Sequence, residues 1–287
     1  MGPGDPPPAS NADVTLAVDI GNTSASFGLF CGQSLLSAWH ADHALSSGDD
    51  ALLQTGERLR AALKQASASG ARLKGVVYCS VSPTRQEALL SMILALTQPF
   101  CDTSSPLVSL GIVPGVTRVA VDIGAYAPEQ LGPDRLVNLC AARALYPNRA
   151  ALVADFGTAA TFDLLDASGR FLGGAIAPGL RTFWDCLPPK TARLQPVSMQ
   201  SAARAAGLST RDCLQSGLAY GYRGLTRGIV DALRTEWPAI DFFRVATGGM
   251  ALAYHELSDS ADAPTFDVID PHLTLRGLAA IAALSAF

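Results

Sequence analysis

The stretch "LAVDIGNTSASFGLF", residues 16–30, places a group of small polar residues between two apolar segments. The first apolar segment ends in Asp19, Gly21 and Asn22 follow, and apolar residues resume at Phe27. This pattern predicts a buried strand, a tight turn and a second strand. A buried strand does not need a carboxylate at its end, so the presence of Asp19 requires an explanation.

A second stretch, "VADFGTAATFDLLD" at residues 153–166, repeats the pattern, with Asp155 and Gly157 lying 136 residues after Asp19 and Gly21. A repeat at domain-sized spacing predicts two similarly built α/β halves. Helical periodicity in residues 49–66 and 217–237 alternates with apolar strand segments such as "GVVYCSVSP" and "FFRVATGGM". This alternation is typical of α/β proteins.

The composition indicates which kinds of partner the protein binds. The chain has 287 residues, 49% of them hydrophobic, a net charge of −4 and only three lysines, so we expect no nucleic-acid-binding face and no membrane span. Six dispersed cysteines without zinc spacing are expected to be reduced core residues. Residues 1–13 are rich in Pro, Gly and Ser, which predicts a disordered leader and not a signal peptide. We therefore expect a cytoplasmic protein with a small-molecule partner.

Each Asp-x-Gly turn combines a carboxylate, a glycine and small hydroxyl residues. A nucleoside triphosphate needs such donors near its phosphates and carboxylates for the accompanying metal ion. The chain contains no GxxxxGK[ST] sequence, which excludes a Walker-type site. Ordinary hairpin turns use the same residues, so both interpretations stay open at this point.

The sequence "GPDR", residues 132–135, places Asp134 in the first turn of a predicted helix. A carboxylate is favoured there by the helix dipole whether or not it has a function. As a functional residue, Asp134 would accept the proton of an attacking substrate hydroxyl, and Arg135 would bind an anionic group.

The segment 173–194 is rich in Gly and Pro, which predicts a shaped loop in which Thr191 either binds a ligand or caps a helix. Gly248 and Gly249 predict a turn after a strand. No GxSxG or HExxH sequence is present, which argues against serine and zinc hydrolases.

Taken in order, "DIGNT", "CSVSP", "GPDR", "DFGTA", "GGAIAPGL", "TARL", "ATGGM" and "LTLRGL" resemble the type III pantothenate kinase family from Val14 onward. The resemblance implies two ribonuclease-H-like domains of the acetate and sugar kinase/Hsp70/actin superfamily, with an active-site cleft between them. We place the two domains at residues 14–125 and 126–287. It also implies a homodimer that phosphorylates pantothenate with ATP, the first step of coenzyme A biosynthesis.

The resemblance further implies a role for each matching residue. Asp134 would be the catalytic base, and Asp155 would hold a monovalent cation, K⁺ or NH₄⁺, while Mg²⁺ would accompany ATP. The residues that would bind ATP are Asp19, Ile20, Gly21, Asn22, Thr23, Ser24, Ala25, Ser26 and Thr158. Those that would bind pantothenate are Tyr126, Gly132, Pro133, Asp134, Arg135 and Thr191.

The chain departs from the family pattern at Pro133, which stiffens the loop before Asp134, and at Gln195, where the family usually has proline. Two rival functions stay open. One is a kinase of the same superfamily that acts on another small alcohol. The other is a non-catalytic, nucleotide-binding regulatory relative, which the presence of Asp19, Asp134 and Asp155 together disfavours.

Overall fold

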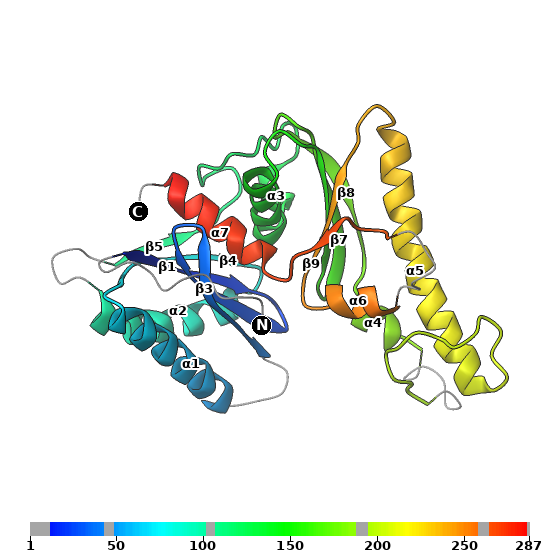
Figure 1. Cartoon of the computed structure of the whole chain (residues 1–287), viewed down its shortest axis with the longest axis horizontal. Helices are drawn as coiled ribbons and strands as arrows, with labels where there is room; N and C mark the ends of the chain where they lie inside the picture. The colour runs from blue at the N-terminus through cyan, green and yellow to red at the C-terminus, as the bar shows by residue number, and fades with distance from the viewer. Residues whose placement is uncertain (1–11, 43–48, 102–106, 188–194, 258–263, 286–287) are drawn as a thin grey trace. The chain divides into compact units, whose positions relative to one another are not determined.

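The structure is a computed structural model that describes residues 12–42, 49–101, 107–187, 195–257 and 264–285. The chain divides into two compact units. Unit 1 comprises residues 1–121, 125–144 and 274–287, and unit 2 comprises residues 122–124 and 145–273. Figure 1 shows the elements of both units along the chain. The expected leader lies almost entirely outside the described residues.

Unit 1 begins with three consecutive strands and then alternates helices with strands. Its elements are β1 (Asp13–Ile20), β2 (Ser24–Cys31), β3 (Ser34–Asp42), α1 (Asp49–Ala68), β4 (Arg72–Ser80), α2 (Pro83–Thr97), η1 (Gln98–Phe100), β5 (Val108–Gly111), η2 (Pro128–Gln130), α3 (Pro133–Leu145) and α7 (Leu273–Leu284). Unit 2 follows the same plan. Its elements are β6 (Ala151–Phe156), β7 (Ala159–Leu165), β8 (Phe171–Pro178), α4 (Leu180–Trp184), α5 (Thr210–Glu236), β9 (Phe243–Thr247), α6 (Ala251–Leu257) and β10 (Val268–Ile269).

Among the described residues, each unit contains one five-stranded sheet, and the two sheets have the same topology. The order is β3-β2-β1-β4-β5 in unit 1 and β8-β7-β6-β9-β10 in unit 2. In each, the first three strands are antiparallel neighbours and the last two are parallel to the strand that carries the Asp-x-Gly turn. The duplication inferred from the repeat is therefore confirmed, together with the α/β class.

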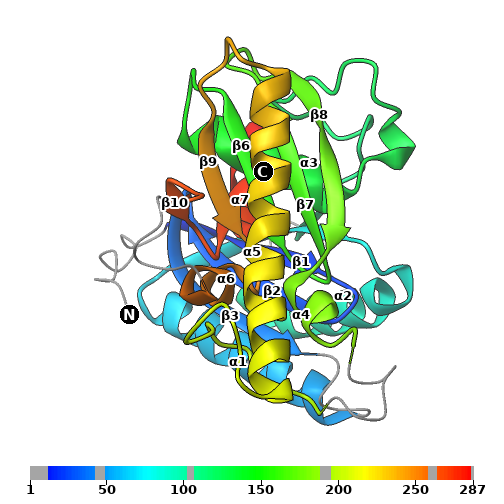
Figure 2. The ribbon, with the colours of Figure 1, turned by 90° about the vertical axis from the view of Figure 1, so that its right-hand side faces the viewer.

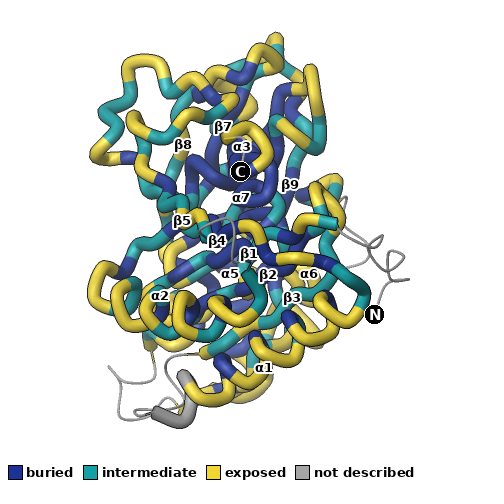
Figure 3. The backbone as a smooth tube through the Cα atoms, turned by 90° about the vertical axis from the view of Figure 1, so that its left-hand side faces the viewer, coloured by how far each residue is buried: buried dark blue, intermediate teal, exposed yellow. Residues whose placement is uncertain are grey.

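The core of unit 1 forms on both faces of its sheet. On one face, Phe27 stacks on Trp39 with ring centroids 5.3 Å apart, and α1 and α2 cover these strands (Figure 1). Gly28, the next residue of β2, faces the other way, and a Cβ atom there would lie 2.7 Å from the Phe30 ring and 3.2 Å from Leu275 of α7. Figure 3 shows the resulting burial, with α7 and the central strands mostly buried and α1 exposed on its outer side.

Helices α3 and α7 belong to unit 1 apart from one terminal residue each, although the expected boundary at residues 125/126 would assign them to the second domain. Thr274 donates a 2.8 Å hydrogen bond to the side-chain oxygen of Asn138, and both residues are buried. A Cβ atom at Gly277 would overlap the backbone carbonyl of Val137. The two helices therefore pack at a distance that only a glycine allows.

Unit 2 is organised around Phe156, which follows Asp155. Its ring stacks on Tyr254 at 4.7 Å and meets Phe162 and Phe266 edge to face. Helix α5 crosses one face of this sheet (Figure 2), and its Tyr222 joins the same aromatic cluster. Truncation of a buried phenylalanine to alanine typically costs about 3–5 kcal/mol of stability, so Phe156 anchors the turn that carries Asp155.

Two further expectations can be compared with the structure. None of the six cysteines forms a disulfide among the described residues, as expected, but only Cys79 and Cys140 are buried, and Cys213 is exposed. The prediction that all six are core residues is therefore wrong. None of the helices in the described ranges has the length and apolar character that a bilayer crossing needs.

Candidate active site

The first Asp-x-Gly turn joins β1 to β2 in unit 1. The backbone N–H of Gly21 donates a 2.9 Å hydrogen bond to the carbonyl of Ser24, which closes the turn. Asn22 and Thr23 are exposed at its tip, whereas the side chains of Ile20 and Ala25 are buried in the core. Any contact of these two buried residues with ATP would therefore use their backbone.

Asp19 stands at the end of β1, in register with Cys79 of the parallel neighbour β4. The Cys79 thiol donates a 3.3 Å hydrogen bond to Oδ1 of Asp19. The pKa of Asp19 is raised to about 6: burial is the main cause, the negative charge of Asp134 adds to it, and the thiol opposes both effects. Asp19 therefore changes charge near neutral pH.

Asp134 lies in the first turn of α3, which begins at Pro133. Proline suits this position because its missing N–H would have no partner inside the helix, so Pro133 is compatible with the start of α3. The backbone N–H of Arg135 donates a 2.8 Å hydrogen bond to Oδ1 of Asp134. A Cβ atom at Gly132 would overlap that same oxygen, so the glycine makes room for the carboxylate.

The pKa of Asp134 is raised, mainly by burial, while the N–H and the positive charge of Arg135 pull it down. Its charge also acts on Asp19, which shows that the fold brings these two carboxylates together. Paired carboxylates of this kind can hold a divalent cation or accept a proton.

Arg135 is 6% exposed and lies against Tyr126. Its Nη1 donates a 3.4 Å hydrogen bond to the Tyr126 hydroxyl, and its guanidinium carbon is 5.9 Å from the centre of the ring. A buried guanidinium held in this way can bind a carboxylate or phosphate with a defined orientation. The structure thus brings together Tyr126, Asp134 and Arg135.

The second Asp-x-Gly turn joins β6 to β7 in unit 2. Here the backbone N–H of Gly157 donates a 3.1 Å hydrogen bond to the carbonyl of Ala159, two residues further on, whereas Gly21 bonds the residue three positions on. The carbonyl of Thr158 accepts hydrogen bonds from the N–H of Gly179, at 3.1 Å, and from the hydroxyl of Thr182, at 2.9 Å. The exposed Thr158 side chain is therefore presented from a fixed backbone.

Gly248, at the end of β9, adjoins Asp155. Its φ of +92° suits glycine, and a Cβ atom there would overlap Oδ1 of Asp155. Thr247 pairs with Asp155 across the β6–β9 ladder and is fully buried, and its hydroxyl has no hydrogen-bond partner among the described residues. A carboxylate beside an unsatisfied hydroxyl offers the oxygen ligands that hard cations prefer.

Some functional features are absent from the sequence-based expectations. Cys79 lies within the quoted "CSVSP", but its contact with Asp19 depends on the pairing of two distant strands. Thr191, the expected pantothenate ligand, lies outside the described residues. No three His, Cys, Asp or Glu side chains in the described ranges gather as a metal centre.

Comparison with known proteins supports the same interpretation. The profile of the family described as Type III pantothenate kinase matches residues 15–232. The chain is 36% identical to the Type III pantothenate kinase of Dehalococcoides mccartyi strain CBDB1 over 263 residues, covering 92% of this chain and 93% of that one. It is 34% identical to the Type III pantothenate kinase of Thermomicrobium roseum over 267 residues, covering 92% and 94%.

Among solved structures, the fold is similar to that of a protein described as a Baf family transcriptional activator from Campylobacter jejuni. The TM-score is 0.54 at 19% identity, and the match covers 94% of this chain and 98% of that one. This likeness concerns the fold alone. On the evidence of the family profile and of relatives matched over nearly their whole length, the chain belongs to the type III pantothenate kinase family.

Proposed function

We propose that the protein transfers the γ-phosphoryl group of ATP to the hydroxyl group of pantothenate, forming 4′-phosphopantothenate and ADP. The observation that carries this proposal is family membership across 92% of the chain. The arrangement of unit 1 supports it, because two carboxylates and a buried arginine meet beside a glycine-containing turn. Phosphoryl transfer depends on positioning and charge stabilisation, which such groups supply.

Asp134 is the proposed base. It accepts the proton of the pantothenate hydroxyl as the oxygen attacks the γ-phosphorus atom. The raised pKa of Asp134 suits this role, since a base is most effective when its pKa lies near the working pH. The hydrogen bond from the N–H of Arg135 keeps the carboxylate in one orientation.

Substrate binding in unit 1 is assigned to the residues around Asp134. Arg135 binds the carboxylate of pantothenate or the transferring phosphate, and Tyr126 holds the guanidinium in place. Gly132 and Pro133 shape the backbone at the start of α3. Thr191 keeps the pantothenate-binding role implied by the family resemblance.

ATP binding is assigned to the two turns. The backbone of residues 19–26 and the exposed Asn22 and Thr23 offer donors to the phosphates, and Thr158 of unit 2 supplies a further hydroxyl. Mg²⁺ accompanying ATP would neutralise charge on the phosphates. Asp19 fits a magnesium ligand, because a carboxylate oxygen is the donor this ion prefers.

Asp155 is the proposed ligand of a monovalent cation, K⁺ or NH₄⁺. The unsatisfied, buried hydroxyl of Thr247 beside it supports this assignment, since a bound cation would satisfy that oxygen. Gly248 is needed to leave space for the Asp155 carboxylate.

The proposal includes a cytoplasmic homodimer. The absence of disulfides among the described cysteines agrees with a reducing compartment. Strand β8 forms one edge of the unit 2 sheet and carries Ile176, which is 63% exposed, as a surface that a second copy could cover. Sedimentation equilibrium of the full chain tests the dimer.

The decisive experiment is phosphoryl transfer from ATP to pantothenate by the purified protein with Mg²⁺, in parallel potassium and sodium buffers. We expect 4′-phosphopantothenate in potassium and much less in sodium. An Asp155→Asn variant should lose the response to potassium. No product in either buffer, with ATP binding intact, would instead favour a non-catalytic relative or another acceptor alcohol. Equal rates in both buffers would reject the cation role of Asp155.

A further inference from the structure

We propose that unit 2 carries a second anion site, suited to a single phosphate group. It lies at the amino ends of β6, β9 and β10, whereas Asp155 lies at the carboxyl end of β6. A cavity of about 220 Å³ lies at these amino ends. Its lining includes Arg149, Arg234, Asp241, Phe243, Arg244 and Asp267. These residues come from the last turn of α5 and from the segments that lead into β6, β9 and β10.

The position of this cavity separates it from the catalytic residues. Strands β6, β9 and β10 are parallel, so their amino ends lie along one edge of the sheet. Arg149 precedes β6 by two residues, whereas Asp155 is at the other end of that strand. A six-residue strand spans about 20 Å, so a ligand bound at Arg149 does not contact the Asp155 turn.

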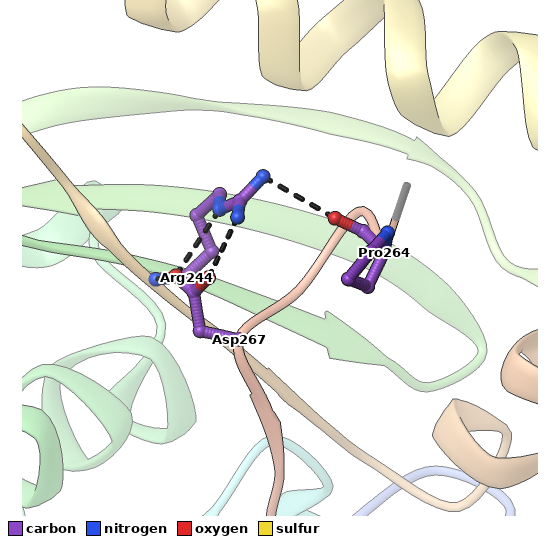
Figure 4. A network of polar contacts seen from close by, with 3 residues as sticks. All are labelled: Arg244, Pro264 and Asp267. Carbon is purple, nitrogen blue, oxygen red and sulfur yellow. Dashed lines mark hydrogen bonds and ion pairs between the residues drawn. The ribbon is translucent and has the colours of Figure 1, made fainter. Parts of the chain in front are cut away.

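Charge in the cavity favours an anion. Three arginines and two aspartates line the cavity, which leaves one positive charge among the lining residues, while the charge of Asp231 in α5 also acts on Arg244. Asp267 is committed to Arg244: its Oδ1 lies 2.6 Å from Nη2, and its Oδ2 accepts from Nε at 3.1 Å and from the backbone N–H at 2.8 Å (Figure 4). Nη1 of Arg244 donates to the carbonyl of Pro264 at 3.4 Å.

The other two arginines remain available to a ligand. Neither Arg149 nor Arg234 forms an ion pair with a described carboxylate, and both residues are exposed. Arg149 lies over the ring of Phe243, with its guanidinium carbon 4.2 Å from the centroid, and Tyr146 packs against Phe243 at 4.5 Å. Stacking of this kind fixes the plane of the guanidinium, so less side-chain entropy is lost when it binds an anion.

Size and geometry indicate the class of ligand. Pockets for drug-sized ligands measure about 300–1,000 Å³, so a cavity of about 220 Å³ suits one phosphate group better than a whole nucleotide. A guanidinium binds phosphate oxygens through two parallel hydrogen bonds. Free inorganic phosphate and the phosphate of a small monoester share this chemistry.

The test is a ³¹P NMR titration of the full chain at constant ionic strength, with inorganic phosphate in one arm and glycerol phosphate in the other. The variants Arg149→Gln and Arg234→Gln should each weaken binding about tenfold, the usual effect of losing a charge-assisted hydrogen bond. Arg211→Gln, which removes an exposed arginine of the same unit outside the cavity, is the matched control and should bind like the wild type.

A variant that is expected to strengthen phosphate binding complements the two arginine variants. Asp267→Asn removes a negative charge and releases Arg244, so it should strengthen phosphate binding several-fold. The arm in which these changes occur identifies free phosphate or a monoester as the ligand. If Arg149→Gln and Arg234→Gln bind both ligands like the wild type, or if Arg211→Gln weakens binding equally, the proposed site is wrong.

Discussion

The Cys79 thiol donates a 3.3 Å hydrogen bond to the Asp19 carboxylate, and the two residues face each other across the parallel pair β1 and β4. The bond stabilises the ionised form of a carboxylate whose pKa is raised to about 6, mainly by burial. It therefore affects the pH range in which Asp19 can act as a metal ligand.

Replacing Cys79 by alanine should move the acid limb of kcat/KM to higher pH. Loss of the thiol removes an interaction that lowers the pKa of Asp19, so the ionised form appears later as the pH rises. A weak donor contributes less than about 1 kcal/mol, which corresponds to roughly half a pH unit. The measurement is a pH profile of kcat/KM, with Cys79→Ser retaining the donor and Cys213→Ala removing an exposed thiol. An unmoved limb in Cys79→Ala would contradict the role of the thiol.

Asp19→Asn should stabilise the protein above about pH 6 in the absence of ligands. The raised pKa means that the folded state binds more protons than the unfolded state between about pH 4 and 6, so wild-type stability falls across this range. The asparagine variant avoids this loss, and the difference in free energy of unfolding should reach about 2–3 kcal/mol. Urea unfolding at pH 4, 6 and 8 measures it. A difference that shrinks as the pH rises would show that the sign is wrong.

Asp134→Asn should lower turnover by roughly a hundredfold or more, the usual loss when a general base is removed. ATP affinity should change little, since the proposed phosphate donors lie in other loops. Initial rates and equilibrium ATP binding measured on the same preparation separate the two effects. Turnover like that of the wild type would remove Asp134 from the mechanism.

Gly132→Ala should reduce turnover with only a small change in stability. Its Cβ would overlap Oδ1 of Asp134 and displace the carboxylate from the N–H of Arg135. Gly224→Ala in α5 is the matched control, because nothing lies within 4 Å of its added Cβ. That change should raise the free energy of unfolding by up to about 1 kcal/mol without affecting the rate. Equal rates in the two variants would show that Asp134 does not need the space.

Gly248→Ala should destabilise unit 2 and abolish the response to potassium. The residue has a φ of +92°, and its Cβ would meet Oδ1 of Asp155 and, at 2.6 Å, the backbone nitrogen of Phe156. Gly249→Ala adds a Cβ with nothing within 4 Å and should behave like the wild type. Thermal unfolding and rates in potassium and sodium distinguish the variants. If both glycine variants behave alike, the position of the Asp155 carboxylate does not depend on the contact with Gly248.

The local sequence determined the positions of the strand ends, the two turns and the start of α3. The turn residues after Asp19 and Asp155 mark the ends of their strands because Gly, Asn and Thr favour turns whatever surrounds them. The spacing between the two turns indicates the duplication, which the matching sheet orders confirm. The first turn of α3 was also predictable, since Pro133 and Asp134 suit a helix start.

Only the tertiary structure decided the assignment of α3 and α7 to unit 1, the burial of Ile20 and Ala25, and the contact of Cys79 with Asp19. It also brought together the arginines around the cavity at the amino ends of β6 and β9. Each of these features joins segments far apart in the chain. Propensity and periodicity describe a residue and its near neighbours, whereas burial, shared charge and close helix packing exist only once distant segments meet.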